Sequence, residues 1–408
     1  MILSKWWLQP LIIFQFKHQL YQLRIFVFLV LVTALFAGCK KNTSRDSVAE
    51  VPCIVGNGIR HGTLIPGQYI VMYKPVRVND ASINMLSTEK KTAGLLKKYD
   101  LSETVIAGRI AGANPGFVAR INETQARALA ADESVELIEQ DKIIALGSCF
   151  TVAAPTLLTW NVKKTGFGDG TGKTAWIIDT GIESTHPDLN VDKNRSRSFV
   201  SGDASIEDKN GHGTHVAGII GAKNNNIGIL GVASNANLIS LKVLNDEGEG
   251  TLSSIIQALA YVNSEAKAGD VVNISLGEEE SSDIFDRHVQ QTAARGVFVT
   301  IAAGNDSKPA SEFSPGRTNA PNIYTVSAVD SLNNFASFSN FGNDAVDYAA
   351  PGVHILSTFT NRRYAYLSGT SMAAPHVAGL LLLSGNKIQT AGFAGNDPDG
   401  TPDPIAMK

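Results

Sequence analysis

Four polar residues stand where buried elements of the chain are expected to begin or end. Asp179 closes the apolar run TAWIID, and Asn305 follows the run TIAAG. His212 lies between two glycines at the start of a helical stretch, and Ser371 lies where the small residues of SGTSMAAPHVAGLLLL lead into an apolar helix. Short apolar runs are typical of buried strands. Because ligands bind at the carboxyl ends of parallel strands, we expect one shared site.

These residue types are suited to nucleophilic catalysis. A serine hydroxyl is a weak nucleophile unless a base removes its proton and a third group orients that base. Ser371 beside His212, with Asp179 behind, would meet this requirement. The Ser371 amide, at a helix N-terminus, and the side chain of Asn305 could both stabilise an oxyanion. Taken singly, each residue also has a structural explanation, Asp179 as a turn cap and His212 as a hydrogen-bonded core residue.

His215 lies one turn beyond His212 on the same expected helix. The H-E-x-x-H spacing of a zinc site is absent. We therefore expect His215 to be structural and His212 to be the exposed histidine.

Two different orders of strands and helices surround these residues. Strands are expected at residues 174–179, 238–244, 271–276, 297–304 and 323–329, and helices at 215–222, 253–268 and 283–296. This alternation predicts an α/β domain whose mainly parallel sheet is covered on both faces. Residues 67–146 instead follow the order strand, helix, strand, strand, helix, strand, which predicts a small ferredoxin-like α+β domain.

The composition is that of a globular protein with a substantial core. The chain has 408 residues, of which 44% are hydrophobic and 18% charged, and the formal net charge is -3. This length allows two or three domains. With no excess of basic residues, nucleic acid is not an expected partner.

The N-terminus carries the features of an export signal. Lys17 and Arg24 precede the apolar block IFVFLVLVTALFAGC, and polar residues follow it at once. Residues 1–38 are therefore interpreted as a signal peptide. FAGC resembles a bacterial lipobox, so Cys39 is the predicted lipidation site, although Phe36 stands where leucine is usual. A plain signal peptide and an uncleaved anchor remain alternatives.

The remaining two cysteines, Cys53 and Cys149, lie on either side of the predicted ferredoxin-like domain. Export would permit a disulfide between them. Two free thiols are the open alternative, because pairing cannot be read from sequence. Residues 39–66 are interpreted as a linker.

The stretches AWIIDTGIESTHPDL, NGHGTHVAG, AAGND and SGTSMAAPHVAG, in the order Asp, His, Asn, Ser, resemble the subtilisin-like serine proteases of peptidase family S8. This chain order is long established for that family. The resemblance implies a three-layer subtilisin-like domain over residues 147–390, with residues 67–146 as its inhibitory propeptide. Residues 391–408 depart from the family pattern, and their turn-forming residues predict a turn-rich, loosely ordered tail. It implies an exported, secreted or lipid-anchored serine endopeptidase, made as a self-processing zymogen cleaved near Gly147 and Ser148.

The resemblance also implies roles for individual residues. Ser371 would be the nucleophile, His212 the base and Asp179 its orienting group, and Asn305 would hold the oxyanion with the Ser371 amide. Substrate would bind as an extended strand, with Leu252 and Leu276 lining an apolar pocket. One binding edge would be formed by Gly248, Glu249 and Gly250, and the other by Ser275, Leu276 and Gly277. A wall of the primary pocket would be formed by Ala302, Ala303 and Gly304.

A structural calcium ion is a further implication, and no organic cofactor is expected. Asp188 and Asn225 would supply side-chain oxygens, and Lys223, Ile227 and Ile229 would supply backbone carbonyls, which are the hard ligands that calcium requires. An asparagine-rich turn without metal is the alternative.

One departure from the family pattern concerns charge near the cleft. SLGG is usual in the family, but this chain continues SLGEEE. Glu278, Glu279 and Glu280 would favour basic substrate residues, or they form a solvated loop.

The expected partners are protein or peptide substrates, the chain's own propeptide and, through a lipid anchor, a membrane. An α/β-hydrolase would show G-x-S-x-G and the order Ser, Asp, His, which this chain lacks. A catalytically dead, lipid-anchored binding protein and a protease for a single partner remain alternatives.

Overall fold

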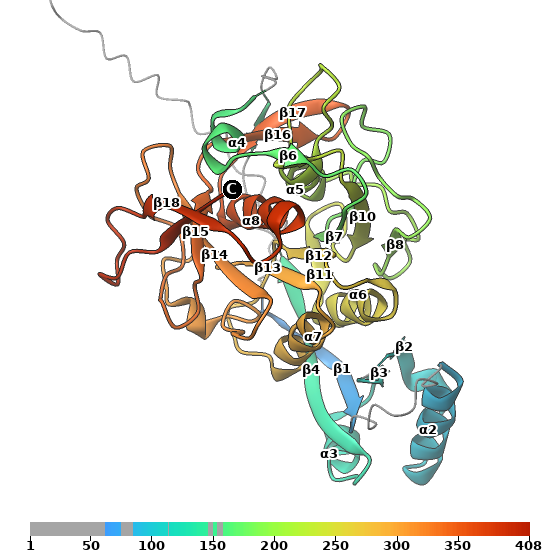
Figure 1. The fold of residues 1–408 in the computed structure, drawn as a ribbon. Helices are drawn as coiled ribbons and strands as arrows, with labels where there is room; N and C mark the ends of the chain where they lie inside the picture. Colours follow the sequence, from blue (N-terminus) through green and yellow to red (C-terminus); the bar gives the residue numbers. More distant parts are fainter. Residues whose placement is uncertain (1–61, 75–84, 113, 146–149, 153–157) are drawn as a thin grey trace, which may run out of the picture. The chain divides into compact units, whose positions relative to one another are not determined.

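The computed structural model describes the chain except for residues 1–61, 75–84, 113, 146–149 and 153–157 (Figure 1). The predicted signal peptide, Cys39, the pair Cys53 and Cys149, and the expected cleavage position lie outside the described residues. All described residues belong to one compact unit, Val51–Lys408. Within the described part of the chain, no helix combines the length and apolarity needed to cross a bilayer.

The N-terminal domain, residues 62–145, has the ferredoxin-like order that the sequence predicts. Its elements are β1 (Leu64–Tyr73), α2 (Met85–Lys98), β2 (Ile106–Ile110), β3 (Gly116–Arg120), α3 (Glu123–Ala130) and β4 (Val135–Ala145). The strands form an antiparallel sheet in the order β4-β1-β3-β2. Asn122 caps α3 through a capping box with Gln125, which confirms the predicted start of that helix.

The two faces of this sheet bury different partners, because alternate side chains of a strand point in opposite directions. In β1, Val71 and Tyr73 pack with Leu95 of α2 and Leu129 of α3. The intervening Met72, and Ile70 before them, join a cluster that includes residues of helix α6 (Leu252–Glu265) in the following domain. The second face of the sheet is therefore covered by the α/β domain.

The α/β domain, residues 150–408, is built on a nine-stranded sheet in the order β18-β19-β15-β14-β13-β12-β7-β10-β8. All neighbouring strands are parallel except β18 and β19. The strands are β7 (Thr174–Asp179), β8 (Arg197–Ser198), β10 (Asn237–Lys242), β12 (Val271–Ile274), β13 (Phe298–Ala302), β14 (Ile323–Val329), β15 (Tyr348–Pro351), β18 (Gln389–Phe393) and β19 (Pro404–Met407). This confirms the predicted α/β fold.

Helices cover both faces of the sheet, which makes three layers (Figure 1). Ala175 and Ile177 of β7 pack on the face covered by α5 (His212–Gly221) and α8 (Thr370–Ser384). Trp176 and Ile178 pack on the opposite face with α6 (Leu252–Glu265) and α7 (Asp283–Ala294). A strand buried on both sides must be apolar throughout, which explains the unbroken run TAWII.

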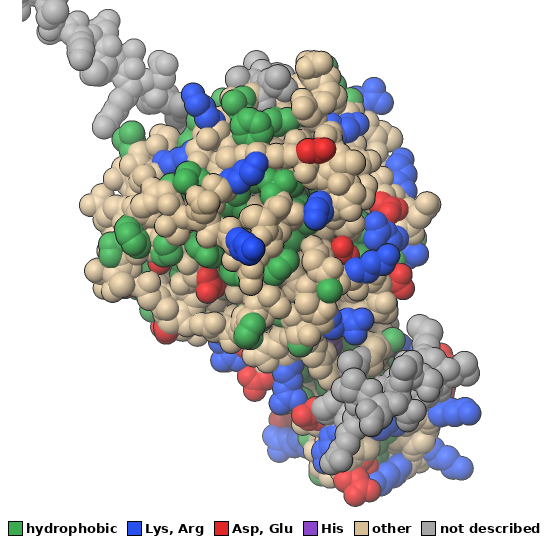
Figure 2. Space-filling model, in the orientation of Figure 1, with side chains coloured by type: hydrophobic (Ala, Val, Ile, Leu, Met, Phe, Trp, Pro, Cys, Tyr) green, Lys and Arg blue, Asp and Glu red, His purple; other side chains and the backbone are tan. Residues whose placement is uncertain are grey.

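Smaller elements complete the domain. They are α4 (Trp160–Thr165), the pair β6 (Gly168–Asp169) and β9 (Ala233–Ser234), β11 (Glu249–Thr251), and the antiparallel sheet of β5 (Phe150–Val152), β16 (Ile355–Phe359) and β17 (Arg363–Leu367). On the face drawn in Figure 2, charged side chains of both signs are interspersed with polar and apolar ones.

The C-terminal segment differs from the loosely ordered tail that we expected. Turns do occur between residues 394 and 403, but β18 and β19 flank them and extend the main sheet. Ile405 is buried with Val329 and Ala349. Asp403 is also buried, and its carboxylate accepts a hydrogen bond from Ser327 Oγ at 2.5 Å. Pairing with β15 and this burial order a stretch whose own composition favours turns.

Candidate active site

Helix α5 presents His212 as its first residue, and a buried carboxylate holds that end of the helix. Gly211 occupies the N-cap position at φ 111°, where it has no side chain to cap the helix. Asp208 accepts hydrogen bonds instead, from the backbone N–H groups of Gly211 at 2.8 Å and Thr214 at 2.9 Å. It also accepts from the Thr180 hydroxyl at 2.9 Å. Asp208 thus links α5 to the turn that follows β7.

Asp179 and His212 meet at the carboxyl end of β7. His212 Nδ1 lies 2.8 Å and 2.9 Å from the two carboxylate oxygens of Asp179. The helix reaches Asp179 because Gly213 has no Cβ: an added Cβ would lie 2.2 Å from the carbonyl oxygen of Gly181 and 3.1 Å from Asp179 Oδ1. The predicted pairing of this base with its orienting carboxylate is therefore present in the structure.

The surroundings of His212 suit a general base. Asp179 is an acceptor, so Nδ1 carries the proton and Nε2 presents a lone pair. The expectation that His212 is exposed is wrong: its side chain is only 2% exposed, because the ring lies against the buried Asp179 at the end of β7. Nε2 is also buried and has no hydrogen-bond partner among the described residues. Burial lowers the pKa of His212, but the charge of Asp179, the hydrogen bond to it and the charge of Asp208 outweigh burial and raise the pKa above the usual 6.5.

Ser371 lies in the first turn of α8, which packs against α5 in a shared apolar cluster. Its side chain is almost buried, and Oγ donates to the carbonyl oxygen of Ser275 at 3.1 Å. Ser275 Oγ in turn donates to the Ser371 carbonyl at 2.9 Å. The described hydrogen bonds thus join Asp179 to His212, whereas the Ser371 hydroxyl is directed to Ser275. Catalytic hydrogen bonds are often unformed without substrate.

Asn305 lies beside the N-terminus of α8. Its Oδ1 accepts from the backbone N–H of Thr370 at 2.8 Å and from the Thr370 hydroxyl at 3.0 Å, which leaves Nδ2 available as a donor. A Cβ added to Gly369 would lie 3.6 Å from Asn305 Nδ2 and 3.7 Å from the Ser371 nitrogen. Two donors therefore converge on a space that the absence of a side chain at Gly369 keeps open.

The first predicted substrate edge is occupied by the chain itself. β11 pairs with β4 in antiparallel register, with Ala145 opposite Glu249, Ile144 opposite Gly250 and Ile143 opposite Thr251 (Figure 1). Ile144 is fully buried in one apolar cluster with Leu252 and Leu276. The two leucines predicted to line an apolar pocket are thus buried in one cluster with a side chain from the N-terminal domain.

The other predicted substrate-binding residues lie at strand ends. Ser275, Leu276 and Gly277 follow β12, and Ala302 ends β13 before Ala303 and Gly304. Asn340 Nδ2 donates to the Ala303 carbonyl at 3.0 Å, and the Gly304 nitrogen donates to Thr370 Oγ1 at 3.1 Å. The β13 end is therefore tied to α8 next to Ser371. Gly248 lies in the turn before β11, at φ 80°.

Two carboxylates of β4 bind the starts of neighbouring helices, and sequence reasoning missed both. Asp141 accepts from the Ser253 backbone N–H of α6 at 3.0 Å and from the Ser253 hydroxyl. Glu139 accepts from the hydroxyl of Ser282, the N-cap residue of α7, at 2.9 Å. A carboxylate is favourable at a helix N-terminus. These contacts could have been predicted from the two acidic residues that alternate in IEQD and from the two later helices, each of which has serines at its start.

The three glutamates after β12 do not behave alike. Glu278 is fully buried, Glu279 forms an ion pair with Lys308, and Glu280 is exposed. The carboxylate of Glu278 lies 3.4 Å from Nζ of Lys142 in β4. The alternative of a solvated loop is therefore wrong for Glu278, because the N-terminal domain covers it.

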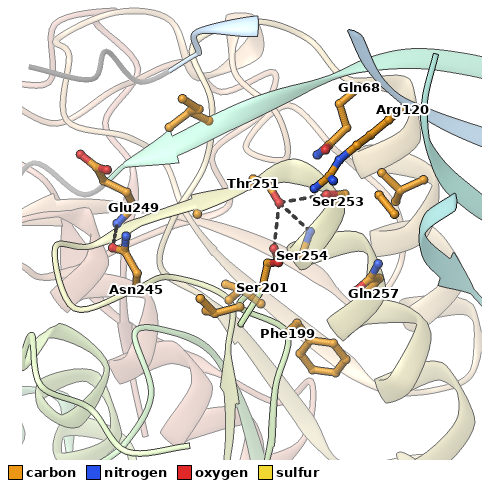
Figure 3. Close-up of a pocket in the computed structure, with 16 residues that line it drawn as sticks. Gln68, Arg120, Phe199, Ser201, Asn245, Glu249, Thr251, Ser253, Ser254 and Gln257 are labelled. Carbon is orange, nitrogen blue, oxygen red and sulfur yellow. Dashed lines mark hydrogen bonds between the residues drawn. The ribbon is translucent and has the colours of Figure 1, made fainter. Parts of the chain in front are cut away.

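A cavity of about 360 Å³ lies beside the β4–β11 pair (Figure 3). Gln68 and Arg120 line it from the N-terminal domain, and Thr251, Ser254 and Gln257 line it from the α/β domain. None of the predicted catalytic residues contributes to its wall. We interpret it as space left between two packed domains and not as the catalytic site.

The predicted calcium ligands also lie together. Asp188 Oδ2 accepts from the Ile229 nitrogen at 2.9 Å and from the Tyr364 hydroxyl at 3.3 Å, whereas the buried Oδ1 has no hydrogen-bond partner among the described residues. The Lys223 nitrogen donates to the Asp188 carbonyl at 2.8 Å. Asn225 Oδ1 accepts from the Ile227 nitrogen at 3.2 Å.

This donor set fits a hard cation, because a buried carboxylate oxygen without a partner lies beside a loop of carbonyl and amide oxygens. The described residues contain no group of three or more His, Cys, Asp or Glu side chains placed to hold a metal. A cation here would therefore depend largely on backbone carbonyls.

Two further buried polar residues support the site. His215 Nε2 lies 2.9 Å from the Ile355 carbonyl, and burial lowers the pKa of His215 to about 3, which agrees with its expected structural role. Lys242, opposite Asp179 in the β7–β10 register, donates to the carbonyl oxygens of Thr180 and Leu244. Lys242 was not identified from the sequence. The one indication that it is buried was its position among the apolar residues of LISLKVL.

The fold and the contact between Asp179 and His212 are those expected of a serine hydrolase on a mainly parallel α/β sheet, and comparison with known proteins narrows this class. The model of the Subtilase family matches residues 170–394. The chain belongs to this family, the subtilisin-like serine endopeptidases.

Individual relatives agree with this assignment. The alkaline protease of Alkalihalobacillus alcalophilus is 46% identical over 214 residues, which cover 52% of this chain and 54% of that protein. The chain thus spans about half the length of this relative. The alkaline serine protease ver112 of Corniculantispora psalliotae is 33% identical over 329 residues, covering 78% of this chain and 79% of that protein. The crystal structure of a cold adapted subtilisin-like serine proteinase aligns with a TM-score of 0.54 and 33% identity, covering 61% of this chain and 98% of the other.

Proposed function

We propose that this chain is a serine endopeptidase that hydrolyses peptide bonds through Asp179, His212 and Ser371. The observation that carries the proposal is the contact between His212 Nδ1 and both oxygens of Asp179, which leaves the buried Nε2 free to accept a proton. Ser371 lies on the neighbouring helix α8. The same arrangement of base and orienting group activates serine in unrelated hydrolases.

The reaction would proceed through an acyl-enzyme. Ser371 Oγ turns from the Ser275 carbonyl to His212 Nε2, transfers its proton to that nitrogen and attacks the peptide carbonyl. Asn305 Nδ2 and the Ser371 nitrogen stabilise the oxyanion. His212 then gives the proton to the leaving amine, and water releases the acyl group by the same steps in reverse. Asp179 keeps the imidazole in the required tautomer throughout.

The pairing of β4 with β11 supports a model for substrate binding. A peptide would take the place of the end of β4 and add an antiparallel strand to residues 249–251. Its side chain in the position of Ile144 would lie among Leu252 and Leu276. Ser275, Leu276 and Gly277 would form the second edge, and Ala302, Ala303 and Gly304 would form a wall of the primary pocket.

The same pairing supports a zymogen. While β4 covers β11, peptide substrates are excluded, so residues 67–146 would act as an inhibitory propeptide until cleavage near Gly147 and Ser148. The alignment with ver112 covers 78% of this chain and therefore extends well beyond residues 170–394. Export, with lipidation at Cys39 or secretion, completes the proposal.

A calcium ion would add stability to the loop of residues 223–229 by binding Asp188 Oδ1, the Asn225 amide oxygen and the carbonyls of Lys223, Ile227 and Ile229. The unpartnered Oδ1 supports this assignment. A melting temperature that does not fall on chelation and does not recover with added calcium would count against it.

The experiment that tests the proposed function compares the purified precursor with its Ser371→Ala variant. The wild-type chain should lose its N-terminal domain, expose a new N-terminus near Ser148 and then digest casein. Ser371→Ala should do neither, and peptide profiling of the active form would define its preferences. A folded wild-type chain that cleaves neither itself nor any peptide would support the alternative of a dead binding protein.

A further inference from the structure

Lys142 is a buried cation at the interface of the two domains. Its side chain is 6% exposed, and its Nζ lies 3.4 Å from Glu139 Oε1, 3.4 Å from Glu278 Oε2 and 3.6 Å from Glu280 Oε2. Glu139 belongs to the same strand as Lys142, whereas Glu278 and Glu280 belong to the α/β domain. An amine of the N-terminal domain is thus held by two carboxylates of the α/β domain.

The position of Lys142 follows from the register of the substrate-like strand. Alternate residues of a strand point to the same side, so the side chains of Lys142 and Ile144 point to the same side of β4. Ile144 is buried in the same apolar cluster as Leu276, and Lys142 pairs with Glu278, two residues further along the chain than Leu276. The apolar contact and the ionic contact are therefore successive subsites along a single extended peptide.

Glu278 is a buried carboxylate that requires a cationic partner. Its side chain has no exposed surface, and neither carboxylate oxygen has a hydrogen-bond partner among the described residues. Lys142 is its nearest opposite charge. Burial raises the pKa of Glu278 to about 7, and the charge of Lys142 offsets part of that effect. An uncharged residue in place of Lys142 would leave this carboxylate buried and unpaired, which is costly.

We propose that Glu278, assisted by Glu280, forms a distal subsite that selects peptide substrates with lysine or arginine two residues before the side chain that occupies the Ile144 position. The inference rests on the proposed function, since it requires that substrates replace the end of β4. Counting back from Gly147, the predicted last residue before cleavage, Lys142 is the sixth residue. The subsite lies beyond β11, so only extended peptides reach it.

Two sets of quenched fluorescent peptides test the subsite with the active enzyme at pH 8.5 and low salt. All share the four residues before the scissile bond that profiling prefers. The short set ends there, and the long set adds two residues, with lysine, glutamine or glutamate in the Lys142 position. We expect the lysine peptide to show a kcat/KM about tenfold above the glutamine peptide, and the glutamate peptide to be the poorest substrate.

Glu278→Gln should remove this preference while leaving cleavage of the short peptide unchanged. Glu279→Gln is the matched control, because Glu279 pairs with Lys308 and not with Lys142, and it should keep the full preference. Equal rates for the long peptides with wild-type enzyme would overturn the subsite even if Glu278→Gln does not fold. A preference retained in folded Glu278→Gln would overturn the assignment to Glu278. Failure to cleave even the short peptide would overturn the proposed function, on which the subsite rests.

Discussion

At the scale of single residues, the two ends of the Asn305 side chain have separate tasks. Oδ1 holds the first turn of α8 through Thr370, and Nδ2 lies beside the open space at Gly369. Asn305→Asp keeps an acceptor for Thr370 but removes the donor. We expect kcat to fall by about 10²–10³-fold with KM little changed, which is the loss known for removal of the corresponding donor in subtilisin.

The melting temperature of Asn305→Asp should stay close to that of the parent, because the contact with Thr370 is retained. Asn305→Ala loses both tasks and should lose stability as well as rate. A normal kcat in Asn305→Asp would show that the amide does not hold the oxyanion.

The acid limb of the pH–rate profile reports the protonation of His212. His212 must be neutral to accept the Ser371 proton, and its pKa is raised above 6.5 by Asp179 and Asp208 against the opposing effect of burial. Activity should therefore be absent well below this pKa and rise as the pH increases through it. A profile of kcat/KM against pH should place the midpoint above 6.5. A midpoint clearly below 6.5 would contradict the environment described for His212.

At the scale of elements, the approach of α5 to β7 depends on Gly213. Because its Cβ would lie 2.2 Å from the Gly181 carbonyl, Gly213→Ala must displace the helix or the turn. We expect a loss of about 1–3 kcal/mol in unfolding free energy, the usual cost of overpacking, and at least a tenfold fall in kcat as His212 moves from Asp179.

Gly395→Ala is the matched control for Gly213→Ala. A Cβ there would meet its nearest atoms at the ordinary distances of 3.6 Å and 3.7 Å. Its thermal unfolding and its peptide hydrolysis should match those of the parent enzyme. If both variants behave alike, the close approach of α5 is not what aligns the histidine.

The interface between β4 and the α/β domain predicts pH-dependent release of the N-terminal domain. The charged groups that act on Glu278 include Lys142, Glu139 and Asp286, and Glu280 contacts the same Lys142 amine. Burial raises the pKa of Glu278 to about 7 in the bound state, and exposure on release should return it towards 4.5. Binding therefore takes up a proton: the favourable contribution is complete below pH 4.5 and is lost as the pH rises through about 7.

The cleaved N-terminal domain should accordingly dissociate more slowly at pH 6 than at pH 8.5. Samples should be incubated at each pH and then assayed for peptide hydrolysis at one common pH. The effect of pH on release of the domain is then separated from its effect on His212. Glu278→Gln should weaken the pH dependence, and Glu279→Gln should preserve it. Faster release at pH 6 would reverse the sign and refute this explanation.

At the scale of the whole molecule, the parts predictable from sequence were those with local signals. Strand runs such as TAWIID, buried on both sides, and the four short motifs led to the sheet, the helices and the candidate catalytic residues. The order of elements in residues 67–146 was enough to predict the ferredoxin-like domain, because its strands and helices carry their own periodicity.

The parts that escaped prediction depend on contacts between distant segments. Asp208 caps a helix from a loop, where an aspartate has many other uses. Glu278 is buried and pairs with Lys142, which lies far from it in the sequence. The strands β18 and β19 are short and flank a segment rich in turn residues, and β19 pairs with the edge of β15. None of these contacts leaves a periodic pattern.

Covalent labelling with a fluorophosphonate, read by mass spectrometry of the digested chain, tests the central claim most directly. The incubated wild-type protein should carry one phosphonyl group on the peptide that contains Ser371, and Ser371→Ala should carry none. Reaction with the fluorophosphonate before the assay should also abolish peptide hydrolysis. A folded, processed wild-type chain that takes no label, or a label that persists in Ser371→Ala, would contradict the account.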